Sequence, residues 1–334
     1  MENRFGGKIK ILTTVLTWLL ILAGVIETVW GLCQVYGYTA SNHSLYALTG
    51  SFYNPGPYSG FLAMCFPVCL HEWLKRGKNV GGYIALGVLL LMLCVLPAGM
   101  SRSAWLAVGI ASAYIGWMHY KKKIMAGIRK HKALTVGAFI ALSFAFGGAY
   151  LLKKDSADGR LLIWKVAVQA IGEKPLTGYG WDYVAGAYGE AQEKYFSKGE
   201  YTEQEEHVAG SPEYVFNEYL QAAMAWGVPV LCVILLLVIA AMAGHQLSGN
   251  YGLFGAMLSL AVFSFSSYPF QFPLFVAAFG LLVLTGLSGW LRFFPVVLLF
   301  PVGLCWCAGI YGAYEYFTHV QEREAVKNRW QRVR

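Results

Sequence analysis

Long apolar segments separated by short polar ones set the pattern of this chain. The apolar segments cover residues 11–33, 59–73, 81–98, 103–119, 133–152, 228–243, 251–267, 274–287 and 293–314. A helix crosses the hydrocarbon core of a bilayer with about 17–25 mostly apolar residues, and several of these segments have that length. The pattern predicts an all-α fold, a polytopic transmembrane bundle of about nine helices.

The composition changes this picture little. The chain is 57% hydrophobic and 13% charged, whereas soluble domains carry about 25% charged residues. Its net charge of +8 arises from Lys and Arg in short loops, which is typical of cytoplasmic loops and gives no reason to expect nucleic acid as a partner. The seven cysteines lie in apolar segments without the spacing of a zinc or redox pair, so we expect small core residues.

One long polar segment, residues 153–227, interrupts the apolar pattern. It holds 12 of the 18 acidic residues but only seven of the 26 Lys and Arg. Because Lys and Arg mark cytoplasmic loops, the positive-inside rule predicts that this segment is external. The predicted organisation is an N-terminal membrane bundle (1–152), an external catalytic loop (153–227), a C-terminal membrane bundle (228–314) and a polar tail (315–334). Nine crossings place that tail outside, although its own charges favour the inside.

Two arginines are candidates for binding an anion. Arg160 and Trp164 share one face of a short helix that we expect to be capped by Asp158 and to end at Gly172 and Pro175. A guanidinium can hold a diphosphate by paired hydrogen bonds. The alternative is an Arg and a Trp that anchor the helix to lipid headgroups.

Arg102 is the only basic residue between Lys78 and Lys121, and the predicted topology puts it at the external end of a tight hairpin. An isolated arginine there needs an anion, either a substrate phosphate or a lipid headgroup that it reaches by snorkelling. If Arg102 and Arg160 converge, they form a site for a lipid-linked diphosphate.

Polar side chains recur at helical spacing where the polar segment leads into the next apolar one. Tyr214, Asn217, Glu218 and Gln221 follow the i, i+3, i+4, i+7 pattern of one helix face. Such a stripe faces a cavity or another helix, or it is simply solvated. His207, the only histidine of residues 153–227, is a candidate general base, with Glu218 and Glu213 as rivals. No acidic pair has the spacing of metal ligands, so we expect no metal and no cofactor.

Four stretches together resemble the O-antigen ligase and polymerase family of membrane glycosyltransferases. They are Thr49–Pro57 (T-G-x-F-x-N-P), Ser101–Ala107 (S-R-x-A-W-L-A), Gly159–Gly180 (R-x-x-x-W and P-L-x-G-x-G) and Asn217–Gly227, which resembles H-N-x9-G-x-x-G. The resemblance spans about residues 48–273, and its Phe-Asn-Glu-Tyr-Leu-Gln form resembles a branch found in Bacteroidetes-type bacteria. Family members have several more helices before the Asn-Pro loop, so the chain is expected to be a compact form or a piece of a longer reading frame.

Two positions depart from the family pattern. Phe216 stands where the family has its histidine, and Val230 stands where its last glycine falls. The first departure implies that His207 or Glu218 replaces the usual base, or that activity is altered or lost. Proline residues 269 and 273 break the last part of the apolar pattern, and the carrier's groove is expected near them.

The resemblance implies transfer of a glycan from an undecaprenyl-diphosphate carrier to lipid A-core, a protein hydroxyl or another glycan. The protein is then expected in the bacterial inner membrane, with its active loop in the periplasm and membrane lipid around it. The implied catalytic residues are Arg160, Arg102, Glu218 and His207, and the implied substrate-binding residues are Trp164, Asn217, Tyr214, Gln221 and Asn54. The alternatives are a polymerase of the same family, a polytopic transporter, and a non-catalytic family member.

Overall fold

The computed structural model describes residues 2–131 and 154–292, and the regular structure in this part of the chain is entirely helical. The helices are α1 (Glu2–Val35), α2 (Pro55–Arg76), α3 (Val80–Val95), α4 (Arg102–Lys130), α6 (Lys154–Glu173), α7 (Val184–Ser197), α8 (Glu203–Val208), α9 (Glu218–Trp226), α10 (Val228–Leu247), α11 (Tyr251–Ser264) and α12 (Pro273–Ser288). Short 3-10 turns, η1 (Leu96–Gly99), η2 (Trp181–Tyr183), η3 (Pro269–Gln271) and η4 (Gly289–Arg292), complete it. The predicted all-α fold is confirmed. The helices expected at 133–152 and 293–314, and the tail, lie outside the described residues.

Three helical stretches in the described ranges are long and apolar enough to cross a membrane: Ile9–Val35, Val80–Gly99 and Val228–Leu247. Their outer faces carry exposed aliphatic side chains, such as Leu19 and Leu22 on α1 and Leu236 and Ile239 on α10. Such wide apolar surface is stable against lipid and unstable against water. The prediction of a helical membrane protein is therefore confirmed. The number of crossings, the domain boundaries and the side on which each loop lies stay predictions.

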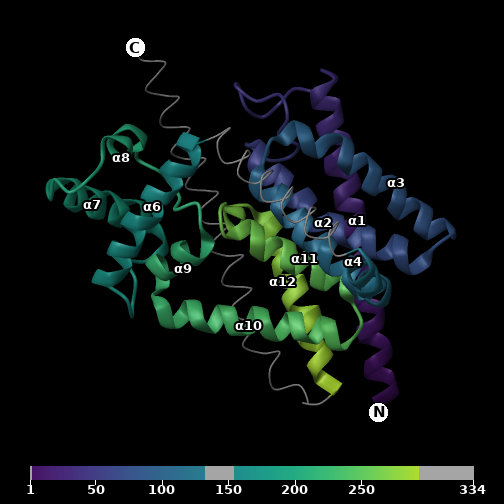
Figure 1. The fold of residues 1–334 in the computed structure, drawn as a ribbon. Helices are drawn as coiled ribbons and strands as arrows, with labels where there is room; N and C mark the ends of the chain where they lie inside the picture. Colours follow the sequence, from purple (N-terminus) through teal and green to yellow (C-terminus); the bar gives the residue numbers. More distant parts are fainter. Residues whose placement is uncertain (1, 132–153, 293–334) are drawn as a thin grey trace, which may run out of the picture.

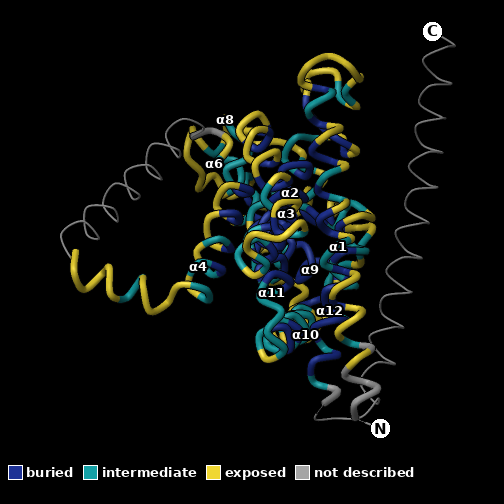
Figure 2. The backbone as a smooth tube through the Cα atoms, turned by 90° about the vertical axis from the view of Figure 1, so that its right-hand side faces the viewer, coloured by how far each residue is buried: buried dark blue, intermediate teal, exposed yellow. Residues whose placement is uncertain are grey.

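The main core surrounds α2, which packs against α1, α3, α4 and α11. Its largest fully buried side chains include Tyr58, Phe61, Phe263 and Phe275, and the rings of Phe61 and Phe275 meet edge to face at 5.5 Å. Figure 2 shows buried residues concentrated along the middle of this bundle and exposed ones at its loops and along the far end of α4. Aromatic packing of this kind fixes the relative positions of α2, α11 and α12.

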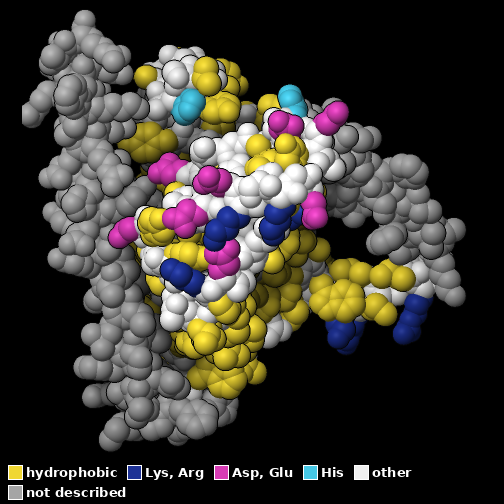
Figure 3. Space-filling view, turned by 90° about the vertical axis from the view of Figure 1, so that its left-hand side faces the viewer, with side chains coloured by type: hydrophobic (Ala, Val, Ile, Leu, Met, Phe, Trp, Pro, Cys, Tyr) yellow, Lys and Arg dark blue, Asp and Glu magenta, His cyan; other side chains and the backbone are white. Residues whose placement is uncertain are grey.

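A second, smaller core joins α6, α7 and α9. Val166, Ala170, Tyr188 and Met224 are all buried in it. Figure 1 shows α6 to α9 gathered on one side of the molecule, with α1 to α4 on the other side and α11 and α12 between them. Figure 3 shows the outer face of this part, where acidic and basic side chains lie over an apolar surface. Two ion pairs, Lys165–Glu205 and Lys194–Glu173, join side chains within this part of the chain.

The start of α6 differs from the prediction. The helix begins at Lys154, so Asp158 lies inside it and does not cap it. The predicted end near Gly172 and Pro175 is confirmed, since α6 stops at Glu173.

The turn after α6 is bound to the end of α9 by backbone hydrogen bonds. Tyr179 N donates to Met224 O (2.8 Å), Gly180 N to Ala225 O (2.9 Å) and Val228 N to Pro175 O (2.7 Å). The close approach requires two glycines. A Cβ on Gly178 (φ +66°) would lie 2.6 Å from the Ala225 carbonyl, and one on Gly227 (φ +83°) would lie 2.3 Å from Leu176 O. The Pro-Leu-Thr-Gly-Tyr-Gly sequence is therefore a docking turn that ties the polar segment to α9 and α10.

We expect Gly178→Ala and Gly227→Ala each to lower the free energy of unfolding by about 1–3 kcal/mol, because both residues combine a left-handed conformation with a backbone clash. Gly172→Ala is the matched control, since a Cβ there meets no atom within 4 Å, and alanine inside a helix stabilises it by about 0.5–1 kcal/mol. Thermal unfolding of the purified protein in detergent measures the three variants. Equal stability of all three would show that the turn is not docked as described.

Candidate functional site

The two candidate arginines lie together where the polar segment meets the bundle. Arg102 is the first residue of α4, whose N-cap is Ser101, and Arg160 lies on α6. The Arg160 Nη1 donates to Ser103 Oγ at 3.4 Å, and Ser103 Oγ is 2.6 Å from Ser266 Oγ. The start of α4, the second turn of α6 and the segment after α11 therefore converge on one point.

The electrostatics of Arg160 are consistent with this proximity. Burial is the larger effect that lowers the pKa of its guanidinium, and the positive charge of Arg102 lowers that pKa further. Two guanidinium groups that repel each other in a half-buried place are stabilised by a bound anion, which removes the cost of both burial and repulsion.

Two segments that contribute to this site contain a residue with a strained backbone conformation. In the described ranges, Met100 (φ 44°) and Phe216 (φ 52°) are the non-glycine residues with positive φ. Met100 immediately precedes the Ser101-Arg102 sequence, and Phe216 precedes Asn217. A left-handed conformation is rare for bulky side chains and costs about 1–3 kcal/mol, and such strain is concentrated at functional sites.

Aromatic side chains form one wall of the site. The Arg160 guanidinium lies over the Phe216 ring at 5.5 Å. Phe216 meets Tyr268 edge to face at 5.0 Å, and Tyr268 stacks on Tyr214 with centroids 5.0 Å apart. Burial raises the pKa of the Tyr268 phenol, although the positive charge of Arg160 opposes this shift. A ring that cannot accept a proton thus packs under the arginine at Phe216, the position where the sequence resemblance leads one to expect a histidine.

Trp164 has an indole N–H without a partner. It lies one helical turn after Arg160, so both side chains share a face of α6. Its ring meets Phe265 edge to face at 5.2 Å, and Nε1 is buried with no hydrogen-bond partner in the part of the chain that the structure describes. A buried unpaired donor costs about 1–3 kcal/mol unless a ligand or water accepts from it.

Glu218 is the first residue of α9, two positions after Phe216. Its side chain is 6% exposed, and its Oε1 accepts a hydrogen bond from Phe270 N at 2.7 Å. Burial raises the pKa of this carboxyl to about 8, against the opposing effect of that hydrogen bond. The residue therefore fastens the break between α11 and α12 to α9 and titrates near neutral pH.

The predicted polar stripe is only partly helical. Asn217 is the N-cap of α9, with its Oδ1 accepting from the amides of Tyr219 (3.0 Å) and Leu220 (3.1 Å). Tyr214 consequently lies before the helix, and a single helix face from Tyr214 to Gln221 is wrong. Gln221 also binds backbone, since its Oε1 accepts from Val215 N at 3.0 Å. Through these hydrogen bonds to backbone amides, Asn217 and Gln221 order residues 214–218, which include the strained Phe216.

Asn54 caps α2 and shapes the loop that precedes it. Its Oδ1 accepts from Gly56 N at 2.9 Å, and the same loop is held by Glu27, which accepts from Ser51 N at 3.0 Å. A Cβ on Gly99 would lie 1.9 Å from Ser59 Oγ, so η1 packs closely on the first turn of α2. The Asn54 turn is thereby fixed close to the Met100–Arg102 segment.

His207 lies apart from these residues on an exposed face. It belongs to the short helix α8, which begins with a capping box at Thr202, and its side chain is exposed. Its neighbour Val208 faces Gly159 on α6. The structure thus places His207 on the rim near the first turns of α6, whereas Glu218 is in the interior.

Sequence reasoning missed Ser103, Tyr268 and the packing role of Phe216. Ser103 follows Arg102 directly as the second residue of α4, and a serine next to a candidate arginine is the signal that could have found it. Tyr268 lies in the Ser-Tyr-Pro break, which the sequence marks as a turn without revealing what it faces.

Taken together, the fold and this site describe a helical membrane protein that gathers two arginines at the junction between its bundle and a polar helical segment. The model of a family described as O-antigen ligase matches residues 87–235, a stretch that contains Arg102, Arg160 and Glu218. The family resemblance recognised in the sequence is therefore confirmed over residues 87–235, where the chain is similar to the O-antigen ligase family. Searches of curated proteins and of solved structures gave no match. The Bacteroidetes-type branch stays a prediction.

Proposed function

We propose that the protein transfers a glycan from undecaprenyl diphosphate to an acceptor at the external face of the bacterial inner membrane, as an O-antigen ligase does. The observation that carries the proposal is the proximity of Arg102 and Arg160, bridged by Ser103. A diphosphate leaving group needs fixed positive charge, and guanidinium groups supply it in the geometry that phosphate oxygens require.

The transfer proceeds by attack of an acceptor hydroxyl oxygen on the anomeric carbon of the glycan. The bond between that carbon and the diphosphate oxygen breaks, and the electron pair leaves with undecaprenyl diphosphate. Arg102 and Arg160 stabilise the charge that develops on the leaving oxygens, and the unpaired Trp164 N–H is oriented on the same face of α6 as Arg160. The proton of the acceptor hydroxyl goes to a base.

We assign the base to Glu218 in preference to His207. Glu218 lies in the interior beside the aromatic wall and has a pKa of about 8, which keeps an appreciable ionised fraction at the pH of the periplasm. His207 is exposed on the rim. With Phe216 at the position of the family's histidine, a carboxylate takes over the proton and the phenylalanine ring supports Arg160.

A specific observation favours one further candidate, a non-catalytic family member. Loss of the family's histidine at Phe216 is the expected mark of a degenerate site. Polymerase activity in the same family uses the same donor chemistry, and only the acceptor differs. A transporter is disfavoured because the polar groups described above cluster at one junction, whereas transport sites lie near the bilayer midplane between repeats.

Reconstitution tests the proposal. The full chain in liposomes, supplied with a synthetic undecaprenyl-diphosphate glycan and lipid A-core, is expected to yield glycan-capped core and free undecaprenyl diphosphate. Lengthened carrier-linked glycan without capped core would identify a polymerase. A preparation that still binds the donor but transfers no glycan to lipid A-core, to a second glycan or to a protein hydroxyl would indicate a non-catalytic family member.

A further inference from the structure

A second polar pocket lies at the other end of α2. The helix has 22 residues and is therefore about 33 Å long. Thr13 and Thr17 on α1, His71, Lys75 and Arg76 on α2, and Asn250 before α11 line this pocket. Its volume is about 40 Å³, enough for a few water-sized groups. The arginine site lies at the beginning of α2, so the two sites are separate.

His71 brings two unpaired polar atoms to the lining of this pocket. Its side chain is 5% exposed, and neither Nδ1 nor Nε2 has a hydrogen-bond partner in the described ranges. The rings of His119 at 5.1 Å and Tyr251 at 5.9 Å pack against it edge to face, so those neighbours offer it rings and no hydrogen bond. A buried imidazole with both nitrogens unpaired is destabilising, and a polar group in the pocket would satisfy one of them.

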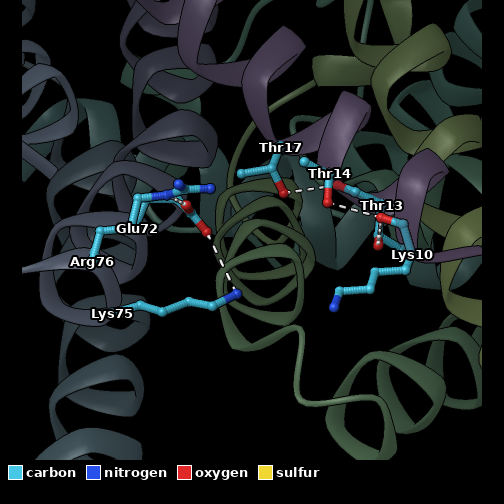
Figure 4. Close-up of polar contacts among 7 residues, drawn as sticks. All are labelled: Lys10, Thr13, Thr14, Thr17, Glu72, Lys75 and Arg76. Atoms are coloured by element: carbon cyan, nitrogen blue, oxygen red, sulfur yellow. Dashed lines mark hydrogen bonds and ion pairs between the residues drawn. The ribbon is translucent and has the colours of Figure 1, made fainter. Parts of the chain in front are cut away.

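The charged side chains around the pocket favour an anion. The buried carboxylate of Glu72 pairs with the Arg76 Nε and lies 3.9 Å from Lys75 Nζ. One negative charge thus faces two positive ones, and Figure 4 shows the side chains of Lys10 and Lys75 pointing toward one another from α1 and α2. Arg76 is held over the Trp18 ring at 5.3 Å. This surplus of positive charge is compensated if an anion binds between the cations.

The threonines limit what the anion can be. The hydroxyls of Thr13 and Thr14 donate to Lys10 O (3.1 and 2.8 Å), and that of Thr17 donates to Thr13 O (2.8 Å). Their protons are therefore used within α1, and the donors available to a ligand are the lysine, arginine and histidine groups. A phosphate group, which accepts many hydrogen bonds, suits such donors.

The surroundings favour a lipid as the source of that phosphate. Beside the threonines, α1 presents Ile11 (66% exposed), Leu12 and Val15 outward. An acyl chain can lie along this apolar face while the headgroup enters the pocket, and Trp18 is suited to the boundary between the two. We propose that the pocket binds the phosphate of an anionic phospholipid. This inference does not depend on the proposed transfer reaction.

Lipid binding to the full chain, purified in neutral detergent, tests the proposal by native mass spectrometry and thermal stabilisation. The probes are dioleoyl phosphatidylglycerol, dioleoyl phosphatidylcholine and inorganic phosphate. We expect phosphatidylglycerol to bind and stabilise the protein well above phosphatidylcholine, and Lys75→Gln to weaken that binding by about 10-fold or more, the effect of losing a charge-assisted hydrogen bond.

Lys78→Gln is the matched control, because Lys78 is also exposed near the end of α2 but does not line the pocket. It removes the same charge and is expected to leave phosphatidylglycerol binding unchanged. Equal weakening by Lys75→Gln and Lys78→Gln would show a merely basic surface and overturn the proposal. Stabilisation by inorganic phosphate with no additional effect of the lipid would overturn its assignment to a phospholipid.

Discussion

Arg160→Gln is expected to lower glycan transfer by about 10²–10³-fold, and Arg102→Gln by a similar factor, because each removes a fixed positive charge that is aimed at the departing diphosphate. The position of the Arg160 guanidinium is fixed by two contacts: it donates to Ser103 Oγ and lies over the Phe216 ring. Arg160→Lys keeps the charge but loses the planar fork, so we expect it to recover only part of the activity. Initial rates in the reconstituted assay measure these effects.

Lys198→Gln is the control for both arginine variants. Lys198 lies in the same polar segment on an exposed position after α7, so its replacement changes the net charge equally without touching the junction. We expect wild-type rates from it. Transfer at wild-type rates by either arginine variant would contradict the assignment of the leaving-group site.

Replacing the Glu218 carboxyl by an amide has the second-largest expected effect. Glu218→Gln keeps an oxygen that can accept from Phe270 N but removes the proton acceptor, so transfer should fall by about 10²–10⁴-fold. The wild-type rate should rise with pH and level off above the pKa of about 8. The residual rate of Glu218→Gln should not show this rise. The His207→Gln variant should behave like the wild type. Loss of transfer in His207→Gln together with wild-type transfer in Glu218→Gln would instead assign the role of base to His207.

The same variant has a signature in stability that does not depend on catalysis. Because the folded-state pKa of Glu218 is raised from 4.5 to about 8, the folded protein holds a proton that the unfolded chain releases. The free energy of unfolding should therefore fall as the pH rises from about 4.5 to 8 and then stop changing. Glu218→Gln should remove this contribution. Unfolding in detergent across that pH range, with no difference between the two proteins, would show that Glu218 is ionised in the folded state.

The sequence predicts the helices well because their apolar lengths are set by the bilayer. It predicts their ends less well. Asn54 and Asn217 are the N-caps of α2 and α9. A residue is recognised as a cap only when its side chain is known to accept from the following backbone amides, which the sequence does not show. For the same reason the predicted cap at Asp158 is wrong, since the residues just before it already belong to α6. Beyond His119, α4 continues through a non-helical Tyr120 to Lys130, although the charges there predicted an end.

The arginines were predictable as candidates because each is an isolated positive charge in its own segment. Their proximity was not predictable from spacing, since 57 residues separate them in the sequence. It depends on the docking turn at Gly178, on the packing of η1 against α2, and on two strained residues, Met100 and Phe216. The aromatic wall of Tyr214, Phe216 and Tyr268 has the same long-range origin.

The central claim is that Arg102 and Arg160 hold one diphosphate together, and a double-mutant cycle tests it most directly. The affinity of the purified protein for undecaprenyl diphosphate is measured for the wild type, Arg102→Gln, Arg160→Gln and the double variant. If both guanidinium groups bind the same diphosphate, the double variant should lose less than the sum of the two single losses, with a coupling of about 1 kcal/mol or more. Losses that add to within about 0.5 kcal/mol would mean that the two arginines act at independent places.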